Sequence, residues 1–206
     1  MIDFLNWYVH DALHLDGVLA RLILSFILAS IVLLSVIIIG WLVNRFEFLQ
    51  MRFLSKFFSQ KTVFVLCNYC TFIGVFFHEL SHAFAAWATG AKVVKVKLFQ
   101  IKRDSDQLGC VEFCPKGSKL QRSCQMALVS CAPVLTGMFF SYIIIRLLFF
   151  HQLDIWINIL LWYVLISIVD HMSMSVADIK NYLKGMLFLF PCMIVICWFF
   201  IYFFMR

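Results

Sequence analysis

Residues 76–90 read F-F-H-E-L-S-H-A-F-A-A-W-A-T-G, a segment apolar enough to cross a bilayer apart from His78, Glu79 and His82. Between residues 63 and 90 no other side chain ionises near neutral pH, except the cysteines. Ionisable groups at membrane depth are costly, and by default they mark a functional site. The stretch therefore predicts a membrane helix that carries a polar site.

The spacing of these three residues is typical of a metal site. His78 and His82 are four residues apart, so on a helix both imidazoles lie on one face, one turn apart. Two such nitrogens can hold one zinc ion, and Glu79 is placed to act on a zinc-bound water. The competing interpretation is structural: the histidines hydrogen-bond within a helix bundle and Glu79 pairs with a lysine. The otherwise bare apolar span favours zinc.

A zinc ion held by two histidines needs a third protein ligand. Asp178 directly follows a later apolar span and is expected on the side of the membrane that His82 approaches. Ser175-x-x-Asp178 also has the spacing of a helix capping box, so capping alone is an alternative role. Asp170 and His171 remain alternative ligands or supporting groups.

Composition places this site in a polytopic membrane protein. Of 206 residues, 64% are hydrophobic and only 14% are charged, with 24 Phe and a mean hydropathy of +0.95, well beyond a soluble domain. No linker-like tract divides residues 1–206, so we expect one all-α membrane domain, and no removable signal peptide is expected. About five transmembrane helices are predicted, near residues 22–43, 63–90, 124–150, 155–176 and 186–205.

Two other segments are expected at the membrane surface. Residues 44–61 alternate aromatic and basic side chains, as in an interfacial amphipathic helix. Residues 91–115 predict a small β-hairpin after the candidate zinc helix, with a polar turn between two short strands. Its first strand has the two-residue period of a sheet, and one face of it carries Val94, Val96 and Leu98.

The charges of the loops predict the orientation and the partners. With five spans, one side of the membrane holds 11 Lys and Arg and the other 6, which favours a cytosolic N-terminus and a cytosolic site. The net charge of +6 is spread over loops that flank the membrane, so it suits anionic lipid headgroups. Nucleic-acid binding has no support.

Three stretches resemble the site-2 protease family of intramembrane zinc metalloproteases. They are the zinc helix F-F-H-E-L-S-H-A-F-A-A-W-A-T-G-A-K-V, the strand-like Leu108-Gly109-Cys110-Val111, and residues 174–185 around Asp178. Ala132-Pro133 also looks like the Gly-Pro-containing helix of that family. The sequence departs from the family pattern in having Ala-Asp-Ile in place of Leu-Asp-Gly, no upstream Asn-Pro, and Thr136 where an Asn is expected.

The resemblance implies a small family member without a PDZ or CBS domain. It implies hydrolysis of a peptide bond in a membrane-spanning substrate near the cytosolic face, with zinc held by His78, His82 and Asp178. A zinc-bound water would be the nucleophile and Glu79 the general base. The edge of the hairpin, at Val94, Val96 and Leu98, is a candidate platform for an extended substrate. Membrane association through the hairpin's lysines is the alternative.

Two other classes of protein are alternatives to this one. Membrane-embedded prenyl-protein proteases also use H-E-x-x-H, but their third ligand is a helical glutamate, and Glu112, the one glutamate after His82, lies in a strand-like segment. A non-catalytic membrane protein that binds a metal or a partner is the non-enzymatic alternative. It does not need Glu79, because water activation is what requires a glutamate beside the first histidine.

Overall fold

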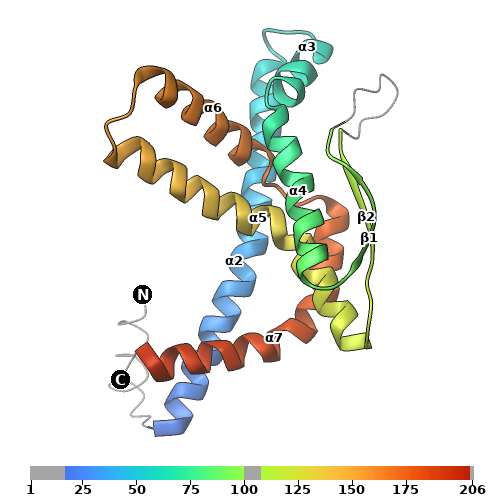
Figure 1. The fold of residues 1–206 in the computed structure, drawn as a ribbon, viewed down its shortest axis with the longest axis vertical. Helices are drawn as coiled ribbons and strands as arrows, with labels where there is room; N and C mark the ends of the chain where they lie inside the picture. Colours follow the sequence, from blue (N-terminus) through green and yellow to red (C-terminus); the bar gives the residue numbers. More distant parts are fainter. Residues whose placement is uncertain (1–16, 100–107, 205–206) are drawn as a thin grey trace.

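The computed structural model describes residues 17–99 and 108–204 and confirms the all-α class (Figure 1). Over these residues the chain forms long helices and one two-stranded sheet, and the sheet follows the H-E-x-x-H helix along the chain. The elements are α2 (Gly17–Leu54), α3 (Gln60–Phe64), the π-helical η2 (Val65–Tyr69), α4 (Phe72–Ala88), β1 (Lys92–Lys97), β2 (Cys110–Cys114), α5 (Lys119–Phe150), α6 (Ile155–His171) and α7 (Val176–Phe204).

Three described helices, α2, α5 and α7, are long and apolar enough to cross a membrane. The pair formed by residues 60–69 and α4 makes a fourth if it is counted as one bent span. The fifth expected span, α6, is apolar but has 17 residues. It is therefore about 26 Å long at 1.5 Å per residue, slightly less than the roughly 30 Å of hydrocarbon. The protein is a polytopic integral membrane protein with three or four candidate spans.

Helix α2 extends beyond its expected end, which corrects the prediction for residues 44–61. Its 38 residues continue without a break through residue 54, so most of the expected interfacial helix belongs to the span itself. No proline or glycine interrupts the chain between Gly40 and the next helix start at Ser59, whose side chain accepts a hydrogen bond from the Thr62 N–H. Without a helix breaker, the helix continues past its expected end to Leu54, and a few turn residues lead from there to the new cap at Ser59.

The expected span 63–90 is broken by a bend of 57° between residues 60–69 and α4. Polar side chains bond to the preceding turn at this point. The Asn68 amide donates to the carbonyl of Phe64 at 3.0 Å, and the Thr71 hydroxyl donates to the carbonyl of Cys67 at 2.6 Å. Side chains that bond to helical carbonyls in this way bend helices, and the π-helical turn at residues 65–69 adds to the irregularity.

A capping box sets the start of α7, which begins earlier than the expected span at residues 186–205. Ser175 and Asp178 bond reciprocally, so the helix begins at Val176, ten residues before the expected span. The same device begins α5, where Ser118 and Gln121 form the box. In both cases local polar chemistry, rather than hydropathy, decides where the helix begins.

The core lies where α2, α5 and α7 pack together. It includes Leu33 and Val36 of α2, Ala127 and Val134 of α5, and the fully buried Tyr182 of α7. The Tyr182 hydroxyl donates to the carbonyl of Leu33 at 3.0 Å, so this polar group is satisfied within the core.

Small residues let the helices approach closely, as is common in membrane bundles. A Cβ added at Gly185 of α7 would lie 2.3 Å from the Ser123 carbonyl oxygen of α5. A Cβ added at Gly74 of α4 would lie 1.9 Å from the Ser167 carbonyl oxygen of α6. Gly185 thus lets α7 approach α5, and Gly74 lets α4 approach α6, more closely than any larger residue would permit.

The hairpin of β1 and β2 lies along α4 (Figure 1). The strands are antiparallel, with a bulge at Val94: Val93 pairs with Phe113, and Lys95 pairs with Glu112. The bulge interrupts the expected two-residue alternation, so Val93 packs with Phe113 against Ala86 and Val129. Leu98 lies after the end of β1, and the predicted polar turn, residues 103–107, lies outside the described residues.

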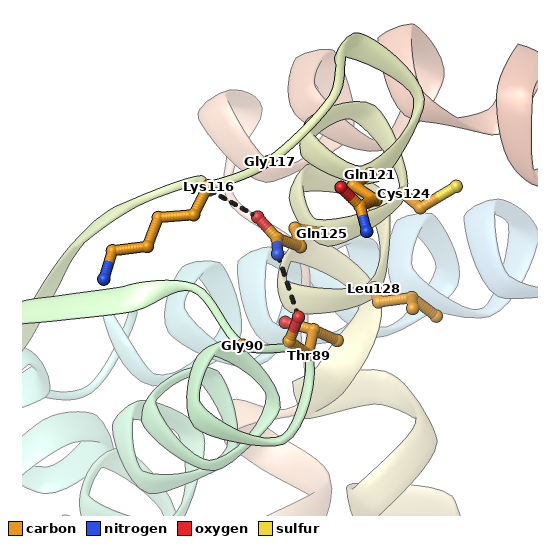
Figure 2. Close-up of a pocket in the computed structure, with 8 residues that line it drawn as sticks. All are labelled: Thr89, Gly90, Lys116, Gly117, Gln121, Cys124, Gln125 and Leu128. Carbon is orange, nitrogen blue, oxygen red and sulfur yellow. Dashed lines mark hydrogen bonds between the residues drawn. The ribbon is translucent and has the colours of Figure 1, made fainter.

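Gln125 of α5 joins the ends of the hairpin segment to α4 (Figure 2). Its side-chain oxygen accepts from the Lys116 N–H, and its amide donates to the Thr89 carbonyl, both at 2.8 Å. A cavity of about 460 Å³ lies beside this junction. Its lining residues are Thr89, Gly90, Lys116, Gly117, Gln121, Cys124, Gln125 and Leu128.

Candidate metal centre

Helix α4 and the first turn of α7 bring His78, His82 and Asp178 together. The Nε2 atoms of the two histidines are 3.1 Å apart, and His82 Nε2 is 3.8 Å from Asp178 Oδ2. One potential ligand atom from each residue lies within 4.8 Å of the other two, a grouping found at no other place in the described chain. The three predicted ligands therefore converge, although 96 residues separate His82 from Asp178.

Backbone carbonyls orient both imidazoles. His78 Nδ1 lies 2.6 Å from the carbonyl oxygen of His171, and His82 Nδ1 lies 2.8 Å from that of Val129. With the ring protons on Nδ1, both rings donate to these carbonyls and both Nε2 lone pairs point into the site. Bonds of this kind are what fix the ring orientation of metal-binding histidines.

The donor set fits a zinc ion. Two Nε2 lone pairs that face each other at 3.1 Å repel, and a shared cation relieves that repulsion. Zn–N bonds of about 2.0–2.1 Å in a tetrahedron place two nitrogens roughly 3.3 Å apart, close to the observed separation. Two imidazoles and one carboxylate are a zinc donor set that leaves a fourth position open. The ligand assignment itself stays a prediction.

Asp178 both caps α7 and lies beside His82, so it matches both roles that the sequence left open for it. Its Oδ2 accepts from the Ser175 N–H at 3.2 Å and from the Ser175 hydroxyl at 2.6 Å, so it caps α7. The same capping box turns the carboxylate toward His82. Capping and proximity to the histidines are compatible here, because the cap is what places this acid at the site.

The alternative ligands are not part of this group, although His171 lines a cavity together with His78 and Glu79. Asp170 is 3% exposed, and its Oδ2 accepts a hydrogen bond from the Gln50 amide at 3.5 Å. The ring of His171 has Nδ1 3.2 Å from the Ser167 carbonyl oxygen, and the part of this residue that reaches His78 is its main-chain carbonyl. The structure therefore groups Asp178, rather than Asp170 or the His171 ring, with the two histidines.

Glu79 faces a cavity of about 350 Å³ beside the three grouped residues. His78, Leu108 and Gly109 share this lining. Gly109 lies so close that an added Cβ would be 2.4 Å from Glu79 Cγ and 2.8 Å from Oε1. The residue just before β2 thus lies against the predicted base, and this residue has no side chain.

Helix α2 contributes cavity residues that the sequence analysis missed. Asn44 and Glu47 line the cavity, and Glu47 Oε2 accepts from the Ser173 hydroxyl at 3.3 Å. A signal was present, because Asn44, Glu47 and Gln50 follow each other at three-residue spacing and share one helix face. The interpretation of this segment as a surface helix concealed it.

The predicted platform residues do not line this cavity. Val94 and Val96 are 55% and 42% exposed, and Leu98 is half-buried. The hairpin residues in the lining are Leu108 and Gly109. The hairpin therefore meets Glu79 through the residues just before β2, and no residue of the predicted platform lines the cavity.

Contacts between α4 and α5 hold the motif in place. Ser81, within H-E-L-S-H, has its hydroxyl 2.7 Å from the Thr136 hydroxyl, which in turn donates to the Ala132 carbonyl at 2.7 Å. Thr136 is the position where the site-2 protease pattern led us to expect Asn. A hydroxyl therefore links the H-E-x-x-H helix, α4, to α5 in this chain.

Replacing Gly109 with alanine is expected to reduce activity at this site at least about tenfold while the metal content stays unchanged. The new methyl group must displace Glu79, and small misplacements of a catalytic group are costly. Activity and zinc content of Gly109→Ala should be measured beside Gly90→Ala. An added Cβ at Gly90 meets nothing within 4 Å, but the backbone there has φ +79°, so this control reports backbone strain without a clash. Wild-type activity in Gly109→Ala would contradict the close approach to Glu79.

Comparison with known proteins adds the family. No curated protein and no solved structure matches the chain. The sequence model described as peptidase M50B-like matches residues 57–204, which include α4, the hairpin and the start of α7. Proteases of the M50 family are zinc-dependent in general, in agreement with the donor set described above. Because the match covers most of the chain, and because its helices form a membrane protein, this protein belongs to the peptidase M50B-like family of membrane metallopeptidases.

Proposed function

We propose that this protein is an intramembrane zinc metalloprotease that hydrolyses a peptide bond of a membrane-spanning substrate near the cytosolic face. The observation that carries the proposal is the position of Glu79, which faces a cavity beside the grouped His78, His82 and Asp178. A protein that only binds a metal has no need of a carboxylate in that place.

Each residue has a role in this mechanism. His78, His82 and Asp178 would hold zinc, which when bound polarises a scissile carbonyl and acidifies a water molecule. Glu79 accepts the proton of the attacking water on its carboxylate and passes it to the leaving amide nitrogen. The Val129 and His171 carbonyls keep the imidazoles in their orientation during the reaction.

The size of the cavity bears on the form of the substrate. A helix with its side chains is about 10–12 Å across, so it would not fit whole into a cavity of about 350 Å³. The scissile segment would therefore unwind, which exposes backbone groups that need partners. An open edge of the hairpin offers such partners, and Val94, Val96 and Leu98 of the β1 side remain our proposed platform.

The charge distribution supports a cytosolic site. Residues 91–122, which contain the hairpin and the start of α5, hold eight of the 17 Lys and Arg residues. Positive loops face the cytosol, where anionic lipids attract them. We therefore propose that the hairpin and the site lie on the cytosolic side.

Cleavage by the purified protein in liposomes tests the proposed function. The substrates would be single-span peptides whose helix is weakened by Asn, Gly or Pro near one end, beside a matched all-Leu span. Cleavage of the weakened spans, lost on zinc chelation and restored by zinc, is expected. Zinc-loaded protein that cleaves none of them would favour the alternative of a non-catalytic membrane protein that binds a metal or a partner.

The platform has its own test in the same assay. Val94 has no cross-strand partner, so proline at this position disturbs the hairpin least while it removes one N–H from β1. Cleavage by Val94→Pro is expected to fall well below that of Val94→Thr, which keeps the shape and the N–H. Equal cleavage by the two variants would exclude pairing along β1.

A further inference from the structure

Pro133 lies inside α5, fully buried, four residues after Val129. In an α-helix the carbonyl of a residue accepts from the N–H four positions later, and proline has no N–H to donate. The carbonyl of Val129 therefore lacks its regular partner within the helix. It is this carbonyl that His82 Nδ1 contacts, at 2.8 Å.

The second imidazole meets an open carbonyl that arises differently. His171 is the last residue of α6, and the last four carbonyls of a helix have no donor within it. His78 Nδ1 contacts the carbonyl of His171 at 2.6 Å. Both histidines thus use helix carbonyls without an intrahelical donor, one because its helix ends and the other because a proline interrupts the hydrogen-bond ladder.

We propose that Pro133 is a positioning residue of the metal centre: it frees the Val129 carbonyl so that His82 keeps its proton on Nδ1 and presents Nε2 to the metal. This inference rests on the proposed function for the identity of the metal. An N–H at position 133 would share the Val129 carbonyl and weaken its bond to His82. A carbonyl has two lone pairs, so weakening rather than loss is expected.

The chain contains a natural comparison. Pro191 interrupts α7 in the same way, and it frees the carbonyl of Leu187, a residue that is 74% exposed. Within the described ranges, no histidine hydrogen-bonds to that carbonyl. A proline inside a membrane helix is therefore not in itself a sign of a metal site, and Pro191→Ala is the matched control.

The test measures zinc affinity by competition with a chromophoric chelator, for the full-length protein in detergent. Pro133→Ala and Pro133→Val both introduce an N–H, and they change the side-chain volume in opposite directions, because alanine is smaller than proline and valine is larger. We expect both variants to bind zinc at least about tenfold more weakly, as for other groups that support metal ligands, and Pro191→Ala to match the wild type. Wild-type affinity in Pro133→Val would overturn the proposal, since loss in alanine alone would indicate a packing defect.

A measurement on the wild type does not depend on the folding of these variants. In protein labelled with ¹⁵N-histidine, the imidazoles of His78 and His82 should each carry a strongly hydrogen-bonded Nδ1–H in the metal-free state. Added zinc should shift the Nε2 signals of these two. Zinc coordination through Nδ1 would overturn the inference. Wild-type protein that binds no zinc would overturn the proposed function, whereas the Nδ1–H signal of His82, identified by its loss in His82→Gln, would still test the bond to Val129.

Discussion

Exchange of Glu79 for glutamine is expected to lower the rate of substrate cleavage by about 10²–10⁴-fold, the usual contribution of a general base. Glutamine has nearly the same shape and still fits beside Gly109, but its amide cannot accept the proton of the attacking water. His78, His82 and Asp178 are untouched, so zinc should stay bound. Loss of cleavage with unchanged zinc content is the result that assigns a catalytic role to Glu79.

The control for this experiment is Asp154→Asn. It makes the same change from carboxylate to amide at the N-cap position of α6, where the Asp154 side chain makes no capping hydrogen bond. Cleavage and zinc content should both remain at the wild-type level. Full cleavage in Glu79→Gln, measured under single-turnover conditions, would contradict the assignment of Glu79 as the base.

Loss of zinc is the expected result of replacing His82 with alanine. The His82 imidazole lies near both His78 and Asp178. Its removal leaves His78 and Asp178 as the only two predicted protein ligands. Elemental analysis should find about one zinc per chain in the wild type and almost none in His82→Ala. The control is His151→Ala, because His151 is an exposed residue at the end of α5.

The matching change at the third ligand is Asp178→Asn, in preference to alanine. Asparagine keeps an oxygen for the Ser175 N–H, so the start of α7 is preserved while the charged ligand is lost. Zinc is expected to bind more weakly and to dissociate on dialysis. If Asp178→Asn retained zinc as firmly as the wild type, the third ligand would have to be sought at Asp170 or His171.

The parts of this site that follow local rules could be predicted from the sequence. The i, i+4 spacing of His78 and His82 requires only a helix, and a 17-residue helix contains both. Ser175 and Asp178 have the spacing of a cap, and the cap forms. Hydropathy predicted a helical membrane protein, because apolar runs of this length are typical of membrane-spanning helices.

The parts that depend on packing could not be predicted in this way. Nothing in the sequence indicates that the end of α6 meets His78, or that the carbonyl of Val129 meets His82, since each contact joins residues far apart in the chain. The extension of α2 and the early start of α7 were missed because hydropathy locates the membrane, whereas caps and breakers locate helix ends. Glu47 was missed together with the extension of α2.

The dual position of Asp178 has a thermodynamic consequence. The carboxylate that would bind the metal also closes the first turn of α7 through Ser175. Metal binding and the ordering of this turn therefore depend on the same group. Coupling between two such equilibria is reciprocal. If metal binding stabilises the ordered turn by a certain free energy, the ordered turn strengthens metal binding by the same free energy. Ser175, which is not itself a ligand, thereby affects the metal affinity of the site. Fraying of the first turn of α7 would weaken metal retention.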